Sequence, residues 1–385
     1  MPELPEVNRA KNLINRVAAG KVIEKVETVE DTIVFAGTTH EEFANELTGR
    51  TLESAGRYGK VFYLNLSGSG KMPVLHFGMT GMLQVKGELA SYYKETPKTA
   101  STDWPPRFMK FILHLLDSET GVTTQLAFLD ARRLGRVRLC ESPLTEPPIS
   151  ELGFDPILSM PSIGEFKPLV LKRSCPIKAL LLDQSFSAGV GNWVAGILYH
   201  LERGSTGAHA SAIDEILYNA RLHPEQRSNT LTDEQLIALH HQTSNVCETA
   251  VSVDADDSKF PENWLFKHRW GKGKKAAHTL KLPTGEPATI KWITVGGRTS
   301  AFVAELQILG GPAKKLTRGK RKAKEEEQGD ESDLGTLTDS DDEKPPIKSP
   351  RTAKVEKKRR KTVDVEAEPT TSNHKAKRTR ARTAR

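Results

Sequence analysis

The pattern of hydrophobic and polar positions first predicts an amino-terminal helix. From Glu6, the stretch EVNRAKNLINRVAAG places apolar residues at helical spacing, namely Val7, Ala10, Leu13, Ile14 and Val17. Pro5 and Glu6 favour initiation, because proline fits a first turn and an acidic side chain faces the positive end of the helix dipole. Gly20 is a candidate carboxy-terminal cap. Pro2 and Glu3 precede the helix, and this pattern does not explain them.

Short β-rich runs follow the helix, separated by Gly, Pro, Ser and Asp. They are KVIEKVETVE, KVFYLNLS, MPVLHFGM, FMKFILHLLD, TQLAFLD and GRVRLC. The runs predict a β-sandwich or barrel over residues 1–145. With the helical segments described next, the predicted fold class is a multidomain α+β protein.

The pattern becomes helical from about Ser162. Helical runs are GEFKPLVLKR, CPIKALLLDQ, DEILYNARL and TDEQLIALHHQTSNVCETAVS, which predict a mainly α domain over 146–255. In the third segment, 256–311, the aromatic stretch FPENWLFKHRWGKGKK precedes TIKWITVGGRTSAFVAELQ. This segment is predicted to be a small hairpin appendage.

Residues 312–385 form a charged tail with few apolar residues, which predicts disorder. The tail holds 22 Lys and Arg and 14 Asp and Glu, whereas residues 1–311 hold 34 and 35. A folded part near neutrality needs a local basic surface to bind nucleic acid. The tail's basic clusters KKRRK and KRTRARTAR predict nuclear import, through an import receptor, or nonspecific contact with polyanions. Solvation alone is the alternative.

Cysteine usage and hydropathy bound the compartment. Cys140, Cys175 and Cys247 are odd in number and far apart, which argues against a disulfide framework and a four-cysteine zinc site. No apolar run approaches the roughly 18 residues of a membrane span, and the first twenty residues lack a secretory signal's apolar core. We expect a soluble intracellular protein, without a membrane partner.

The terminal Pro2 offers a nucleophile if Met1 is removed. Its group would then be a secondary α-amine, and α-amino groups have a reference pKa of about 7.7–8, so an appreciable fraction is unprotonated at neutral pH. Such an amine can attack a sugar C1′ and form a Schiff base. Glu3 could protonate the ring oxygen as the sugar opens, if its surroundings keep it protonated.

Six motifs accompany this pair in order: MPELPEV, GRYGK, LHFGMTGML, LDARRLGR, SAGVGNW and GGRTSAF. Over residues 1–310 the sequence resembles the formamidopyrimidine-DNA glycosylase/endonuclease VIII family, most closely its plant and fungal branch. The resemblance implies a helix-two-turns-helix domain at 146–255 and that Pro2 is the nucleophile and Glu3 the acid. It also implies that Glu6 is a second carboxylate near the sugar.

The resemblance further assigns phosphate contacts. Lys60 matches a lysine that grips phosphates beside the lesion; an ordinary solvated turn lysine is the alternative. Asn192 lies in the glycine-rich turn, where backbone N–H groups and a side-chain amide can bind a phosphate. Taken alone, that motif would indicate only a turn.

Three residues match the wedge that fills the gap left by a flipped nucleotide. Met79 and Arg132 match the family's methionine and arginine. The family commonly has phenylalanine at the third position, where this chain has Leu134, which is apolar but cannot stack as a ring would. This difference puts recognition of the opposite base in question.

The third segment corresponds to the family's zinc finger, yet residues 260–310 contain no cysteine. His268 and His278 lack thiolate or carboxylate partners at ligand spacing and are interpreted as surface residues. The segment resembles the zincless finger of this family, so we expect no metal and no cofactor. Arg298 would then reach the scissile phosphate from the hairpin turn.

An insertion separates the GVGNWVA turn from the helix DEILYNARLHP. Removing residues 196–213 restores the family's continuous junction, and a retained short intron or a genuine loop would explain them. Sequencing of transcripts would distinguish the two.

The sequence therefore predicts a monomeric, nuclear enzyme of base excision repair acting on damaged double-stranded DNA. It would remove formamidopyrimidines and hydantoins, with 8-oxoguanine as a further candidate substrate, through the Pro2 Schiff base, and then cut the strand by β- and δ-elimination. One alternative is a catalytically impaired DNA-binding isoform disrupted by the insertion. Another is a chromatin protein defined by its tail.

Overall fold

The amino-terminal helix forms as predicted. The computed structural model describes residues 2–88, 103–192, 212–269 and 279–310. Helix α1 (Leu4–Ala18) has Glu3 as its N-cap and buries its apolar face in the core of the sheet. The cap residue is Ala19, and the next residue, Gly20, has a left-handed conformation with φ of +80°. Since glycine adopts this conformation without a Cβ clash, the chain can leave the helix there.

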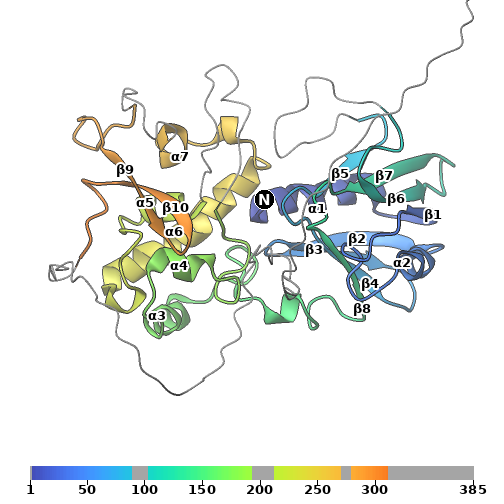
Figure 1. Cartoon of the computed structure of the whole chain (residues 1–385), viewed down its shortest axis with the longest axis horizontal. Helices are drawn as coiled ribbons and strands as arrows, with labels where there is room; N and C mark the ends of the chain where they lie inside the picture. The colour runs from blue at the N-terminus through green and yellow to red at the C-terminus, as the bar shows by residue number, and fades with distance from the viewer. Residues whose placement is uncertain (1, 89–102, 193–211, 270–278, 311–385) are drawn as a thin grey trace, which may run out of the picture. The chain divides into compact units, whose positions relative to one another are not determined.

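Eight strands form one antiparallel sheet, in the order β5-β7-β6-β1-β2-β3-β4-β8 (Figure 1). The strands are β1 (Lys21–Thr28), β2 (Thr51–Tyr58), β3 (Val61–Leu66), β4 (Met72–His76), β5 (Met82–Val85), β6 (Met109–Leu116), β7 (Thr123–Leu129) and β8 (Arg136–Cys140). The large antiparallel sheet confirms the α+β class. The sequence pattern missed β2, β5 and α2 (His40–Leu47).

The sheet folds over its own core. Strands β1 and β2 share only two residue pairs, so they join two four-stranded halves. Phe77, which follows β4, stacks on Phe128 of β7 with ring centroids 5.8 Å apart, although β4 and β7 are not neighbours in the sheet. The halves therefore pack face to face, as in the predicted sandwich, while their hydrogen bonds run through one sheet.

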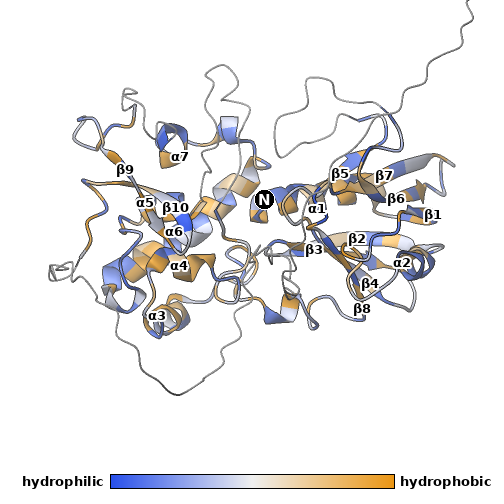
Figure 2. Ribbon diagram, viewed as in Figure 1, coloured by the Kyte–Doolittle hydropathy of each residue, from blue (hydrophilic) through white to orange (hydrophobic). Residues whose placement is uncertain are grey.

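Helices build the following part around a second core. They are α3 (Ile163–Leu171), α4 (Ile177–Leu182), α5 (Ala212–Asn219) and α6 (Asp233–Ser252). Figure 2 shows α4 as almost wholly hydrophobic and α2 as largely hydrophilic, which explains why only α4 was evident from its sequence. None of the helices in the described ranges combines the length and apolar character that crossing a bilayer requires.

The predicted insertion, residues 196–213, is described only at its end. Residues 196–211 lie outside the described residues. Ala212 and Ile213 belong to α5, and both are buried in the helical core. These two residues directly precede Asp214. If residues 196–213 were removed, Val194 and Ala195 would take their places, and either apolar pair suits these buried helical positions.

A hairpin closes the described chain. Strands β9 (Ile290–Val295) and β10 (Arg298–Val303) pair in register across the Gly296–Gly297 turn, as the third segment predicted. A short helix, α7 (Leu265–His268), precedes them and was not predicted. The tail predicted for 312–385 lies outside the described residues, and the domain boundaries at 145 and 255 remain predictions.

Candidate active site

Glu3 and Lys60 meet beside Gly191. A Cβ atom placed on Gly191 would lie 2.5 Å from Glu3 Oε1 and 2.5 Å from Lys60 Nζ. These groups come from the start of α1, the β2–β3 turn and the turn before Asn192. Lys60 is buried, which contradicts the reading of an ordinary solvated lysine. The fold thus joins three of the sequence motifs in one place, directly after the buried Pro2.

Close backbone packing explains the glycines of these motifs. The Leu4 N–H donates a hydrogen bond to the Gly189 carbonyl at 3.3 Å. Gly189 has φ of +92°, and a Cβ there would lie 2.9 Å from Leu4 Cβ. A side chain would force the glycine-rich turn away from the amino terminus of α1.

The Glu3 carboxyl is buried, and its pKa is raised. Burial raises its pKa to about 8, against the opposing positive charge of Lys60. The negative charge of Glu6 adds to the rise, and the charge of Arg298 opposes it. Neither carboxyl oxygen has a hydrogen-bond partner among the described residues. At neutral pH this carboxyl therefore holds a proton, as a general acid must.

Glu6 fixes the backbone at this end of α1. Its Oε2 accepts a hydrogen bond from the Glu3 N–H at 3.0 Å, and both residues are buried. This is one half of a capping box, in which a helical carboxylate satisfies a backbone donor of the N-cap. Glu6 therefore holds the segment that carries Pro2 and Glu3.

Glu3→Gln is expected to raise the Tm at pH 8 and to leave it nearly unchanged at pH 5. Unfolded Glu3 ionises near its ordinary value of 4.5, whereas folded Glu3 keeps its proton up to about 8. The folded state binds more protons between these values, so this residue lowers stability as pH rises. Glutamine has no such proton. Thermal unfolding at both pH values measures the effect, and an equal Tm difference at both would contradict the raised pKa.

A buried ion pair supports the turn that carries Lys60. The Arg57 guanidinium pairs with Asp155, whose Oδ2 also accepts the Gly59 N–H at 2.8 Å. Arg57 Nε lies 3.3 Å from Asn8 Oδ1 on α1. Arg57 therefore links α1 to Asp155, and Asp155 in turn holds the turn that carries Lys60. No local pattern in the sequence indicates this pairing, because its partners are 98 residues apart.

The predicted wedge residues come together on two adjoining loops. Arg132 Nη1 lies 3.5 Å from Met79 Sδ. A Cβ on Gly78 would lie 2.3 Å from the Leu134 carbonyl oxygen, so these loops touch. Arg132 is exposed, and Met79 and Leu134 are partly exposed. The group is therefore accessible to a ligand.

Buried Asp130 ties the two wedge loops together. Its Oδ1 accepts hydrogen bonds from Thr80 Oγ1 at 2.6 Å and from the Arg132 N–H at 3.1 Å. Its Oδ2 accepts the Gly135 N–H at 2.6 Å. In the sequence, this residue was visible only as the aspartate of the LDARRLGR motif. The structure shows that its carboxylate connects the two loops by hydrogen bonds.

A second carboxylate, Asp31, holds the wedge loop from outside. Its Oδ2 accepts a hydrogen bond from Arg133 Nε at 2.9 Å, and its Oδ1 accepts one from Arg133 Nη2 at 3.0 Å. Lys110 Nζ also donates to Oδ2, at 2.8 Å. Burial tends to raise the pKa of Asp31, but the hydrogen bonds from Arg133 and Lys110 hold it well below its usual value. The charged carboxylate therefore restrains Arg133, which has φ of +58°.

Asn192 and Arg298 approach the Glu3 centre from the helical part and the hairpin. Asn192 follows Gly191, and its Oδ1 is buried with no hydrogen-bond partner in the described part of the chain. Arg298 is exposed at the start of β10, and its charge is felt at Glu3. Both side chains can serve as donors to a phosphate near Glu3 and Lys60.

The hairpin segment offers no evident metal site. Within residues 2–88, 103–192, 212–269 and 279–310, no three His, Cys, Asp or Glu side chains form a group able to hold a metal ion. His268 Nδ1 lies 2.7 Å from Thr279 Oγ1, and its Nε2 lies 2.7 Å from the Glu262 carbonyl oxygen. Both ring nitrogens are therefore engaged. His278 lies outside the described residues.

Chelators are expected to leave both activity and Tm unchanged. A structural metal contributes folding free energy, so its removal would lower the Tm. The measurement is base excision and thermal unfolding before and after dialysis against a strong chelator, with elemental analysis alongside. One zinc per chain would overturn the zincless assignment.

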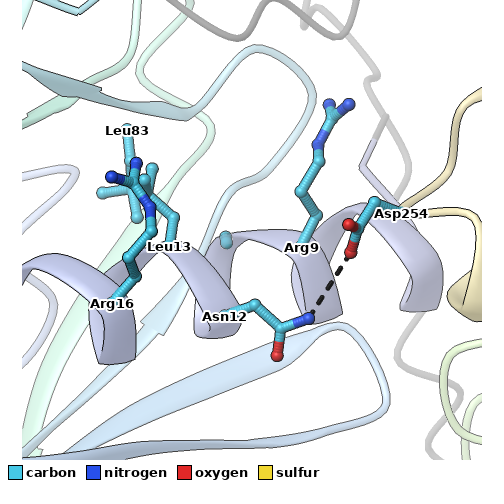
Figure 3. Close-up of a pocket in the computed structure, with 7 residues that line it drawn as sticks. Arg9, Asn12, Leu13, Arg16, Leu83 and Asp254 are labelled. Carbon is cyan, nitrogen blue, oxygen red and sulfur yellow. Dashed lines mark hydrogen bonds between the residues drawn. The ribbon is translucent and has the colours of Figure 1, made fainter.

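A separate pocket of about 240 Å³ lies along α1, lined by Arg9, Ala10, Asn12, Leu13, Arg16, Leu83 and Asp254 (Figure 3). Asn12 Nδ2 lies 3.5 Å from Asp254 Oδ1 across it. Arg16 is paired with Glu88 at 2.7 Å. None of the candidate catalytic residues lines this pocket.

Comparison with known proteins points to one family. The model of the formamidopyrimidine-DNA glycosylase N-terminal domain matches residues 1–137. The chain is 39% identical over 331 residues to formamidopyrimidine-DNA glycosylase of Arabidopsis thaliana, covering 85% of this chain and 77% of that protein. It is 28% identical over 315 residues to the Bacillus subtilis protein of the same name, covering 80% of this chain and 99% of that protein.

Solved structures share the fold. The crystal structure of Lactococcus lactis formamidopyrimidine-DNA glycosylase, noncovalently bound to DNA that contains an abasic site, aligns with a TM-score of 0.59. The alignment has 21% sequence identity and covers 80% of this chain and 99% of that chain. The α+β arrangement around the Glu3–Lys60 centre is thus an established protein fold.

Proposed function

The chain belongs to the formamidopyrimidine-DNA glycosylase family and is a DNA glycosylase for oxidised bases, and we propose that it also cuts the strand through a Schiff base on Pro2. The observation that carries this proposal is the buried Glu3 carboxyl, protonated at neutral pH beside Lys60 and directly after Pro2. Damaged double-stranded DNA is the proposed substrate.

The proposed reaction begins once Met1 is removed. The lone pair of the Pro2 nitrogen bonds to C1′ of the damaged nucleotide, and the glycosidic electron pair leaves on the base, which takes up the nitrogen's proton. Glu3 gives its proton to the ring oxygen as the sugar opens, which leaves a cationic imine. This cation acidifies the C2′ hydrogen, which passes to the Glu3 carboxylate formed in the previous step as the 3′ phosphate leaves. The conjugated cation then acidifies the C4′ hydrogen, which passes to water as the 5′ phosphate leaves.

The remaining residues hold the DNA in the proposed complex. Lys60, Asn192 and Arg298 would bind phosphates near the lesion, where fixed donors position the sugar against Pro2. Met79, Arg132 and Leu134 would fill the space left by the flipped nucleotide. From the resemblance to the plant and fungal branch, we propose ring-opened purines and hydantoins as the favoured lesions and 8-oxoguanine as a further candidate. Because Leu134 cannot stack as a ring would, we expect it to alter recognition of the opposite base.

Borohydride trapping on DNA with an abasic site tests the function. Reduction of the imine by borohydride converts it to a stable amine, so the wild-type protein should form a covalent complex with the DNA. Glycosylase activity without any trapped complex would show a different mechanism. Binding without either activity would favour the impaired DNA-binding isoform.

Deleting residues 312–385 is expected to weaken nonspecific DNA binding and to flatten its dependence on salt. The tail carries an excess of eight positive charges, whereas the rest of the chain is near neutral. Fewer phosphates are then neutralised, so fewer counterions are released. Binding to undamaged duplex across a salt series measures the slope. Turnover on saturating lesion DNA should survive, and its loss would make the tail part of the active architecture.

The same tail is proposed to direct the protein to the nucleus. Its clusters KKRRK and KRTRARTAR have the composition that import receptors bind. A fluorescent fusion of the full chain should concentrate in the nucleus, whereas the truncated fusion should spread into the cytoplasm.

A further inference from the structure

A buried ion cluster lies beneath the hairpin that carries Arg298. Asp214 Oδ1 lies 3.0 Å from Lys178 Nζ and accepts a hydrogen bond from Ser300 Oγ at 2.6 Å. Asp214 Oδ2 accepts the Ala301 N–H at 2.8 Å and pairs with Arg269 Nη1 at 2.6 Å. All four side chains are almost completely buried.

The cluster joins four elements that are distant in sequence. Lys178 comes from α4, Asp214 from the first turn of α5, Arg269 from the end of α7 and Ser300 from β10 (Figure 1). Lys178 Nζ also donates to the Thr299 carbonyl at 2.9 Å. Three successive residues of β10, starting directly after Arg298, are therefore fixed to one carboxylate and its lysine.

The neighbouring Glu215 anchors the same region a second time. Its carboxylate oxygens accept the backbone N–H groups of Leu265 at 3.3 Å and Phe266 at 3.0 Å, which begin α7. α7 in turn presents Arg269 to Asp214. Two adjacent acidic residues of α5 thus hold both the helix and the strand of the hairpin segment.

Because its charges are buried, this cluster is stable only when all of its partners are present. A buried charge is stable only when it is paired and hydrogen-bonded, so loss of one partner leaves the others unsatisfied. Burial lowers the pKa of Lys178, and the charge of Asp214 opposes that change. The hairpin can therefore adopt few other arrangements while the cluster is intact, which restricts where Arg298 can lie.

We propose that Asp214 and Arg269 position Arg298 for DNA, in the mechanical role that a structural metal has in small metal-bound domains. Arg269 is a positioning residue, since it acts through the hairpin and not on the substrate. The proposal rests on the proposed contact of Arg298 with a phosphate. It assigns to ordinary side chains the ordering of a segment in whose described residues no three His, Cys, Asp or Glu side chains form a group able to hold a metal ion.

A double-mutant cycle tests the proposal. Arg269→Met, Arg298→Ala and the double variant are compared in full-length protein by single-turnover excision and by borohydride trapping. Each single variant should slow excision by about 10- to 100-fold, because small displacements of a positioning group cost that much. The double variant should be no slower than Arg298→Ala within about twofold, since an absent arginine cannot be misplaced.

Lys267→Met is the matched control. Lys267 is a cation of the same short helix, but it pairs with the exposed Glu262 outside the cluster. Its removal should change excision by less than about twofold, as exposed ion pairs contribute little. Circular dichroism shows whether each variant is folded. If Arg269→Met does not fold, Ser300→Ala takes its place in the cycle, because it removes one hydrogen bond and little volume.

The outcomes separate the two proposals. Losses that multiply in the double variant would mean that Arg269 acts through general stability, and this would overturn the inference. An Arg298→Ala variant that excises normally would also overturn it, because there would be no contact to position. Absence of trapping by the wild-type protein would reject the Schiff base instead, and the excision cycle would still report on Arg269.

Discussion

Pro2→Gly is expected to reduce the borohydride-trapped complex on abasic DNA by on the order of 100-fold or more. The substitution replaces a secondary amine by a primary amine, and it removes the ring that restricts rotation of the amine about the N–Cα bond. Pro2 is buried at the entry to α1, and the neighbouring Glu3 backbone is held by Glu6. A glycine amine would remain reactive but would sample many positions relative to C1′.

Pro5→Ala is the matched control for this substitution. Pro5 lies in the first turn of α1 and has no amino group to offer. Its replacement should leave trapping within about twofold, because alanine is a good helix former. Mass spectrometry should first confirm that Met1 is absent in every protein. Undiminished trapping by Pro2→Gly, with the adduct on an internal lysine, would reject Pro2 as the nucleophile.

Local periodicity predicted the elements whose residues repeat clearly. α1 and α6 have long apolar stripes, and six of the eight sheet strands lie in apolar-rich runs separated by Gly, Pro, Ser and Asp. α2 has only Phe43 and Leu47 as buried residues, so its signal is the capping box of Thr39 and Glu42 instead. β5 is four residues long, which is too short for a period to emerge.

The motifs identified the candidate side chains but could not place their supports. Glu3, Lys60 and Asn192 stand in recognisable patterns. Asp155 and Asp31 act on partners about 100 residues away, and only the folded chain brings those partners within hydrogen-bond distance. The burial of Glu3 is also visible only in the folded chain. From the sequence, a protonated Glu3 could therefore be proposed only on the condition that its surroundings raise its pKa.

In the hairpin segment too, the sequence identified the candidate side chain but not the residues that support it. The sequence showed that cysteines are absent from the third segment and named Arg298. It did not show Arg269 beneath β10, because Arg269 stands in a run of basic residues that resembles a solvated surface. A buried cation among exposed ones has no local signature.

Glu3→Gln is expected to slow base excision by about 100- to 10,000-fold, the usual contribution of a general acid. Glutamine has nearly the same shape but no proton to transfer. On a preformed abasic site the loss should be smaller, because part of that sugar is already an open aldehyde that Pro2 can attack directly. Single-turnover rates on lesion DNA and on abasic DNA, measured with the same protein, give the two losses.

The pH dependence of excision provides a second readout of the same carboxyl. The wild-type rate should fall as pH rises through about 8, where Glu3 gives up its proton, whereas the residual rate of Glu3→Gln should lack that step. Glu24→Gln, which removes an exposed carboxylate from β1, should retain the wild-type rate and profile. Equal losses on lesion and abasic DNA would mean that Glu3 does not act by protonating the ring oxygen. Its buried carboxyl would then serve to hold Lys60 and the amino terminus in place, and the acid would have to be sought among the groups that the bound DNA brings to this centre.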